Sequence, residues 1–138
     1  MGRIVALDYG KKRTGLAVSD PLKMIAGGLT TLTSIETIGF LKKYVAENEV
    51  DSFILGDPRQ MNNKPSENRE RVLKFKKDLQ RTFPDIEIKM IDERFTSHLA
   101  HQAMIQGGLK KKDRRNKALV DELSATILLQ SFLEARKI

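Results

Sequence analysis

The chain has no cysteine, no tryptophan and only two histidines. The absence of cysteine excludes a disulfide framework and any thiolate metal site, which leaves carboxylates and the two histidines as possible metal ligands. Carboxylate oxygens suit hard cations. If the protein binds a metal, we therefore expect a hard divalent cation.

The sequence also has no long apolar run. A helix that spans a membrane needs about 20 consecutive apolar residues, and no such stretch is present. The pattern of a buried strand begins by residue 4, which does not fit a signal peptide. We therefore expect a cytoplasmic protein without membrane association. Its 138 residues, 40% hydrophobic and 31% charged, predict one compact domain over residues 1–138.

The net charge of +7 is concentrated in one segment. Between positions 110 and 117, six cations accompany a single acid. The cations are Lys110, Lys111, Lys112, Arg114, Arg115 and Lys117. Such a cluster favours a polyanionic partner such as a nucleic acid, although a solvated basic loop without a specific partner is a common alternative.

The first strong structural signal is the apolar run Ile4–Leu7, which ends in Asp8. Its β-branched residues and lack of polar alternation predict a strand buried on both faces. Ligand and metal sites gather at strand ends of open α/β sheets, so Asp8 is a candidate site residue. A turn aspartate is an equally good interpretation of this stretch alone.

The next part of the chain is typical of antiparallel hairpins. A second strand, Thr14–Ser19, follows a short connection in which Gly10 supplies the turn and three cations lie at the tip: Lys11, Lys12 and Arg13. The Thr-rich segment Leu29–Thr33 predicts a third strand. Three antiparallel strands therefore come first.

The pattern then changes to alternating helices and strands. Ser34 is a candidate N-cap for a helix that carries apolar residues at helical spacing. The further elements expected are a strand at Asp51–Gly56 parallel to the first, a helix at Ser66–Phe83, a strand at Ile86–Ile91, a short helix that ends at Gly107-Gly108, and a final helix from Asn116 onward.

The final helix carries an acid on its apolar side. Asp121 shares one helical stripe with Ala125, Leu128 and Phe132. Burying a charge without a partner costs several kcal/mol, so Asp121 is expected to meet a cation, a hydrogen-bond donor or a metal. A structural salt bridge and a functional role are equally good interpretations at this point.

Four motifs in order along the chain carry a family resemblance. They are Leu7-Asp8-Tyr9-Gly10 followed by Lys12-Arg13, Gly15 and Ala17; Gly56 with Pro58 and Met61; Asp92-Glu93-Arg94 with Thr96; and Val120-Asp121-Glu122-Leu123 leading to Ala125 and Leu128-Leu129-Gln130. With these motifs the chain resembles, essentially end to end, the YqgF/RuvX family of bacterial pre-16S rRNA nucleases, also described as Holliday junction resolvases. The order of its elements is similar to that of the ribonuclease H-like fold.

The resemblance implies an α/β fold with a mixed five-stranded sheet, three antiparallel strands followed by two parallel ones, flanked by helices. It also implies a metal-dependent endonuclease that processes the 5′ end of pre-16S rRNA. The alternatives are a resolvase that cleaves branched DNA and a domain that binds nucleic acid without cutting it. A pure binder would not need three acids. We expect a nucleic-acid partner and a monomer or weak homodimer.

The resemblance also implies the residues of the site. Asp8, Glu93 and Asp121 would hold two divalent ions, Mg²⁺ or Mn²⁺, which suit phosphodiester hydrolysis. The expected phosphate-binding residues are Lys12, Arg13, Arg94, Lys110, Lys111, Lys112, Arg114 and Arg115.

Glu93 is one of two adjacent acids. Strand alternation places Asp92 and Glu93 on opposite faces but does not by itself choose between them, and the resemblance favours Glu93. His98 and His101 lie three positions apart and have no third ligand near them in the sequence, so a surface location is the better interpretation.

Overall fold

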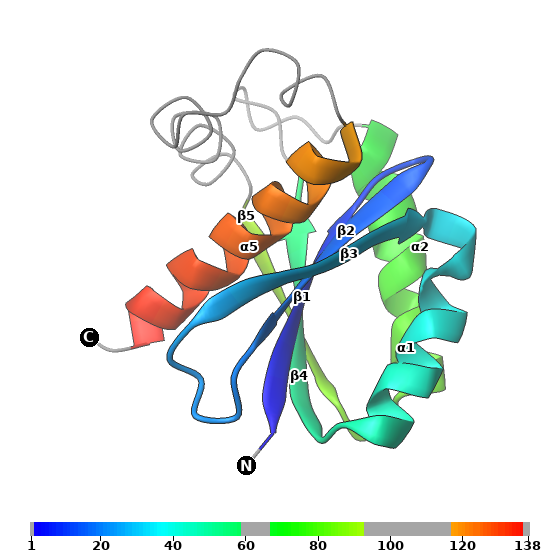
Figure 1. Ribbon diagram of the computed structural model, residues 1–138. Helices are drawn as coiled ribbons and strands as arrows, with labels where there is room; N and C mark the ends of the chain where they lie inside the picture. Colours follow the sequence, from blue (N-terminus) through cyan, green and yellow to red (C-terminus); the bar gives the residue numbers. More distant parts are fainter. Residues whose placement is uncertain (1, 59–66, 93–116, 137–138) are drawn as a thin grey trace.

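A computed structural model describes residues 2–58, 67–92 and 117–136 (Figure 1). The strands are β1 (Arg3–Tyr9), β2 (Arg13–Ser19), β3 (Ala26–Thr33), β4 (Val50–Asp57) and β5 (Glu87–Asp92). The helices are α1 (Thr37–Glu47), which follows a short 3-10 turn, α2 (Glu67–Thr82) and α5 (Lys117–Arg136).

The five strands form one mixed sheet in the order β3-β2-β1-β4-β5. β1 pairs antiparallel with β2, and β2 pairs antiparallel with β3. β4 lies parallel to β1 on its other side, and β5 lies parallel to β4. The predicted arrangement of three antiparallel strands followed by two parallel ones is therefore confirmed, with β1 in the centre.

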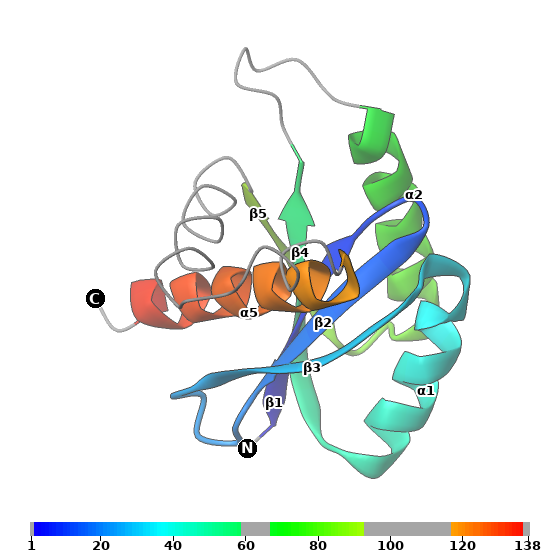
Figure 2. The ribbon, with the colours of Figure 1, turned by 45° about the horizontal axis from the view of Figure 1, so that its top comes forward.

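Helices cover both faces of this sheet (Figures 1 and 2). On one face, Val5, Leu7, Phe53 and Leu55 pack with residues of α1 and α2. On the other face, Ile4, Ala6 and Ile54 pack with residues of α5. The four apolar residues of β1 thus alternate between two cores and are at most 1% exposed. The prediction that this strand is buried on both faces is confirmed.

The predicted role of Ser34 is wrong. Thr33 occupies the cap position of the 3-10 turn, and α1 itself begins only at Thr37. Ser34 is buried, and its hydroxyl donates to the carbonyl of Gly10 and hydrogen-bonds Thr14 Oγ1 at 2.9 Å. A buried hydroxyl needs partners, and those of Ser34 come from the β1–β2 hairpin. It joins the end of β3 to that hairpin.

β3 starts earlier than the sequence predicts, and one predicted helix lies where the structure describes no residues. β3 begins at Ala26, three residues before the predicted start, because Gly27 and Gly28 pair with β2 within the sheet. The predicted short helix before Gly107-Gly108 lies outside the described residues. Among the helices that the structure describes, none is long and apolar enough to cross a membrane.

The backbones of β2 and α5 meet at Gly15. A Cβ atom on Gly15 would lie 2.1 Å from the carbonyl oxygen of Asp121 and 2.9 Å from the backbone nitrogen of Glu122. No side chain fits at that distance, and backbone atoms cannot rotate away as a side chain can. Glycine at this position therefore determines how closely α5 lies on the sheet.

Gly15→Ala is expected to lower the free energy of unfolding by about 2 kcal/mol, because α5 must move away from β2. Chemical denaturation measures the change. Gly39→Ala in α1 is the matched control, since a Cβ there meets nothing within 4 Å and alanine is the better helix former by up to about 1 kcal/mol. Equal stability of the two variants would contradict this account of the packing.

Candidate active site

Asp8 and Asp121 are brought together around Gly15. Asp8 is paired with Gly15 across the β1–β2 ladder, and the backbone of Asp121 lies directly against Gly15. Asp8 is two positions beyond Ala6, so its side chain lies on the sheet face that α5 covers. Both acids are partly exposed. Asp8 and Asp121 therefore lie near each other on one face of the sheet, and that they form one site stays a prediction.

Asp121 has a cationic partner. Arg13, at the start of β2, donates from Nε to Asp121 Oδ2 at 2.9 Å. The side chains of Arg13 and Asp121 are 38% and 27% exposed. A structural salt bridge is one of the two interpretations of Asp121 from the sequence, and this salt bridge is present. Its cation, Arg13, is one of the residues expected to bind phosphate. Lys12, the neighbouring candidate, is exposed.

The third predicted ligand, Glu93, lies outside the described residues, as does Arg94. The structure does place its neighbour, Asp92. In β5, Ile88 and Met90 pack with the α1 and α2 side of the core, whereas Ile91 packs with the α5 side. Strand alternation therefore puts Asp92 on the α2 side, opposite the face of Asp8 and Asp121.

A second polar cluster lies on that opposite face, and the sequence analysis missed it. Asp57, at the end of β4, is 6% exposed and accepts a hydrogen bond from Arg69 Nε at 2.9 Å. Asn68, at the start of α2, donates from Nδ2 to the backbone carbonyl of Tyr9 at 3.1 Å. These contacts attach the start of α2 to the ends of β1 and β4. The available signal was Asp57, which ends a buried strand as Asp8 does.

Asn68 and Tyr9 have unusual surroundings in this cluster. The side-chain oxygen of Asn68 is buried and has no hydrogen-bond partner among the described residues. Burial raises the pKa of Tyr9, the nearby charge of Asp78 raises it further, and Arg71 opposes the shift. The Tyr9 ring stacks on Phe75 with the ring centroids 4.3 Å apart. Tyr9 is therefore a packed residue whose phenol stays protonated at neutral pH.

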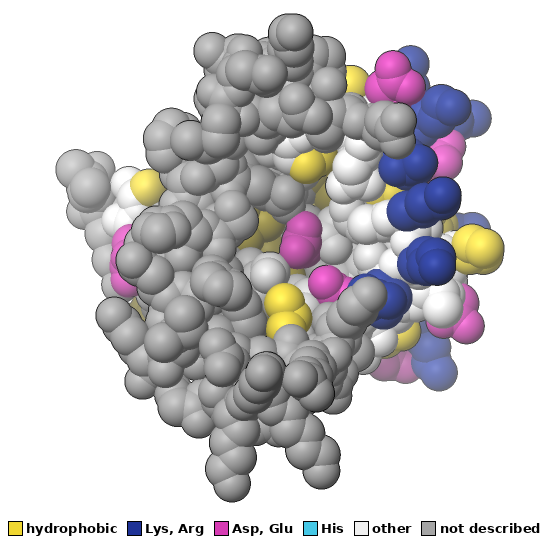
Figure 3. Space-filling view, turned by 90° about the horizontal axis from the view of Figure 1, so that it is seen from above, with side chains coloured by type: hydrophobic (Ala, Val, Ile, Leu, Met, Phe, Trp, Pro, Cys, Tyr) yellow, Lys and Arg dark blue, Asp and Glu magenta, His cyan; other side chains and the backbone are white. Residues whose placement is uncertain are grey.

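The surface above the site carries both signs of charge. Figure 3 views the molecule from the end toward which β1 and β4 run. Lys and Arg side chains form a row down one side of this face, and acidic side chains lie next to it, beside the atoms drawn in grey.

The carboxylates of Asp8 and Asp121 suit a hard divalent cation. Within the described ranges, no group of three or more His, Asp or Glu side chains is placed to hold a metal ion. Asp8 and Asp121 therefore fit the metal by the chemistry of their carboxylates, and a third carboxylate would have to come from outside those ranges. The cations from Lys110 to Arg115 and the two histidines, His98 and His101, also lie outside them.

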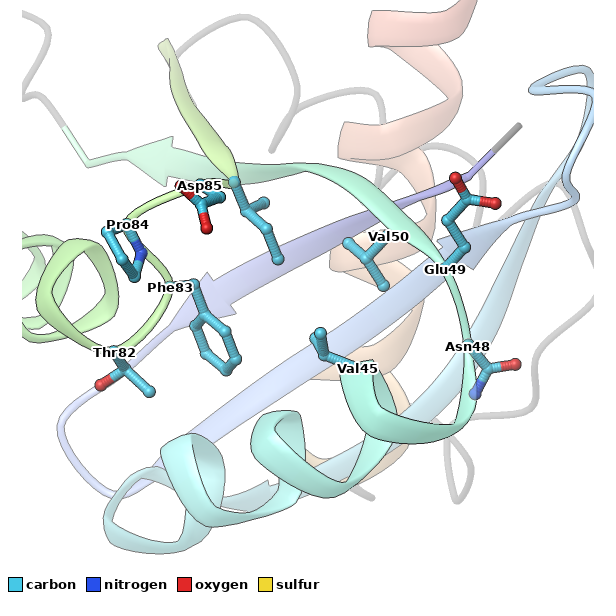
Figure 4. A pocket seen from close by; sticks show the side chains of 9 residues that line it. Val45, Asn48, Glu49, Val50, Thr82, Phe83, Pro84 and Asp85 are labelled. Atoms are coloured by element: carbon cyan, nitrogen blue, oxygen red, sulfur yellow. The ribbon is translucent and has the colours of Figure 1, made fainter.

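A separate pocket of about 470 Å³ lies at the opposite end of the sheet, where α1 and α2 end (Figure 4). Val45, Val50 and Phe83 point into it, and its other lining residues are Asn48, Glu49, Thr82, Pro84, Asp85 and Ile86. The charged residues in this lining are acids, which repel phosphate. These acids therefore disfavour a phosphate backbone at this pocket.

The architecture is that of the ribonuclease H-like fold. T. thermophilus RuvC in complex with a Holliday junction substrate has the same fold, with a TM-score of 0.59 and 16% identity over 99% of this chain and 96% of that one. Fowlpox virus resolvase bound to Holliday junction DNA gives a TM-score of 0.57 and 16% identity over 97% and 98% of the two chains. At these identities the likeness establishes the fold.

Sequence similarity identifies the family. The family model described as RuvX, Holliday junction resolvase, matches residues 2–135, and the chain belongs to this family. Proteins from Phocaeicola vulgatus and Bacteroides thetaiotaomicron are 58% and 55% identical to it, each over 137 residues and 99% of both chains. Both bear the name "Putative pre-16S rRNA nuclease". The protein is accordingly a nuclease, an enzyme that hydrolyses phosphodiester bonds.

Asp57→Ala is expected to lower the free energy of unfolding by about 2 kcal/mol, because it removes the buried carboxylate to which Arg69 Nε donates. Asp78→Ala is the control: Asp78 pairs with Arg81 in the same helix, but their side chains are 58% and 78% exposed, so the change should stay within about 0.5 kcal/mol. Thermal and urea unfolding of both variants measure the difference. Similar values would mean that the Asp57 pair does not fix α2 to β4.

Proposed function

We propose that this protein is a metal-dependent endonuclease whose natural substrate is the precursor of 16S ribosomal RNA. The observation that carries the proposal is the meeting of Asp8 and Asp121 around Gly15, at the end of a strand buried on both faces. The names of its relatives at 54–58% identity support ribosomal RNA as the substrate. The enzyme would act in the cytoplasm as a single domain, monomeric or weakly dimeric.

In the proposed reaction, the metal ions and the protein side chains have different roles. When bound between carboxylates, divalent ions such as Mg²⁺ or Mn²⁺ make water nucleophilic and stabilise the leaving oxygen of a phosphodiester. Asp8, on the rigid central strand, would hold two ions, and Asp121 and Glu93 would each complete the ligands of one. Lys12, Arg13 and Arg94 would bind the phosphates on either side of the scissile bond.

Glu93 remains our choice for the third ligand. Asp92 shares the α2 side of the sheet with Met90 and lies opposite Asp57 in the β4–β5 ladder, on the face away from Asp8. An acid on that side cannot share an ion with Asp8 through the sheet. Glu93→Gln is therefore expected to be the inactive variant and Asp92→Asn the active one.

Asp8→Asn and Asp121→Asn are each expected to reduce cleavage roughly a hundredfold or more, because even ligands that only orient a metal site are worth 10–100-fold. Neither change should destabilise the fold much, since Asp8→Asn relieves repulsion among acids and the Arg13–Asp121 pair lost in Asp121→Asn is partly exposed. The assay is gel-resolved cleavage of a precursor rRNA fragment, with thermal unfolding as the check on folding. Asp78→Asn, an exposed acid on α2, is the control and should cleave normally.

Branched DNA is the second candidate substrate, and the description of the family as Holliday junction resolvases favours it. Contacts to phosphates carry no base information and so do not distinguish the two. Cleavage of the precursor fragment and of a four-way junction, compared side by side with Mg²⁺ and with Mn²⁺, discriminates between them. If the junction is cut efficiently while the RNA fragment stays intact, the RNA proposal is wrong.

We also propose that the basic residues from Lys110 to Arg115 bind the substrate backbone. Replacing Lys110, Lys111, Lys112, Arg114 and Arg115 with alanine is expected to weaken nucleic-acid binding for all sequences alike. For each cation that no longer neutralises a phosphate, the plot of log affinity against log salt should become flatter by roughly 0.7 to 0.9 units. Fluorescence anisotropy over a salt series measures the slope, and an unchanged slope would identify this segment as merely solvated.

A further inference from the structure

One cation is held directly by a carboxylate of the candidate active site. Arg13 and Asp121 are 108 positions apart in the sequence, and their pair links the start of β2 to the first turns of α5. The backbone of Arg13 is fixed independently, because its carbonyl accepts a hydrogen bond from the Gly10 nitrogen at 2.9 Å. The side chain can therefore change partner without disturbing the hairpin.

A divalent ion and the Arg13 guanidinium would compete for Asp121. The guanidinium nitrogen lies 2.9 Å from Asp121 Oδ2, which is the space that a metal bound to that oxygen would use. An ion there would also repel Arg13, since two positive charges would share one carboxylate. Occupation of Asp121 by a metal is thus expected to release Arg13.

The exposure of the pair makes this exchange feasible. With side chains 38% and 27% exposed, the Arg13–Asp121 pair belongs to the class of partly solvated ion pairs that contribute little to stability. The Arg69–Asp57 pair, whose carboxylate side chain is 8% exposed, is more strongly held and would resist such an exchange. Lys12, exposed on the same hairpin, gives a released Arg13 a basic neighbour beside which a phosphate can bind.

We propose that Arg13 is a displaceable partner of Asp121 that couples metal binding to nucleic-acid binding. Without metal, Arg13 neutralises Asp121. When a metal binds, Arg13 turns to the phosphate backbone, so that each ligand strengthens the binding of the other by the same factor. This inference rests on the proposed function, because it takes Asp121 as a metal ligand.

The first test measures the affinity of the substrate-free protein for Mn²⁺ by calorimetry. Arg13→Gln removes both the competitor and the repelling charge, and it should bind Mn²⁺ about three- to tenfold more tightly than the wild type. Lys11→Gln removes the same charge from an exposed site on the same hairpin, and solvent and salt should limit its effect to less than about twofold. Equal affinities of the two variants would overturn the competition.

The second test measures the coupling. Binding of a short RNA is followed by anisotropy with EDTA and with Ca²⁺, which takes the same oxygen ligands as Mg²⁺, and a gel verifies that the RNA stays intact. Ca²⁺ should strengthen binding to the wild type and to Lys11→Gln by the same factor, and by a factor several times smaller for Arg13→Gln. If Arg13→Gln keeps the full enhancement, Arg13 does not carry the coupling.

The outcomes separate this inference from the proposed function. If Asp121→Asn leaves Mn²⁺ affinity unchanged, Asp121 is not a metal ligand, and both the metal site and the exchange at Arg13 are wrong. If Asp121→Asn weakens Mn²⁺ binding but Arg13→Gln behaves as Lys11→Gln does, the metal site stands and only the exchange is wrong. Tighter Mn²⁺ binding by Arg13→Gln alone, together with reduced coupling to RNA, supports both.

Discussion

The contact between the backbones of β2 and α5 at Gly15 organises the functional end of this protein. A Cβ atom there would lie 2.1 Å from the Asp121 carbonyl oxygen, so the absence of a side chain is what allows the helix to reach the sheet. Gly15 is also the ladder partner of Asp8. One close approach therefore brings together two acids that are more than a hundred positions apart, and the apolar contacts of Ala125, Leu128 and Leu129 hold it in place.

The alternation of side chains along the strands sorts the polar residues into two groups. Asp8 follows the Ile4 and Ala6 side of β1, toward α5, whereas Asp57 follows the Phe53 and Leu55 side of β4, toward α2. The first group is partly exposed and suits metal and phosphate. The second is more buried, and its contacts with Arg69 and Asn68 fix α2 to the sheet. Polar residues that lie close together along one edge of the sheet therefore need not belong to one site.

Electrostatics connects the fold to the proposed chemistry. Clustered carboxylates repel one another, so the metal-free protein needs cations near them. Arg13 fills this role for Asp121 through a partly exposed pair, which in our proposal a divalent ion replaces at small cost. A buried pair such as that of Asp57 would be a poorer choice for an exchangeable ligand. The two ion pairs therefore differ in burial, and in our proposal only the more exposed one exchanges its partner.

The sequence by itself determined the order of the elements, the mixed sheet and the burial of β1, and it singled out Asp8 and Asp121 as candidates, because periodicity and strand ends are local signals. Only the tertiary structure decided that Ser34 serves the hairpin and not α1, that Arg13 pairs with Asp121, and that Asp92 faces away from Asp8. It also revealed the cluster of Asp57 with Arg69. These facts depend on contacts between distant segments and on which face of the sheet each segment joins, and no local pattern encodes either.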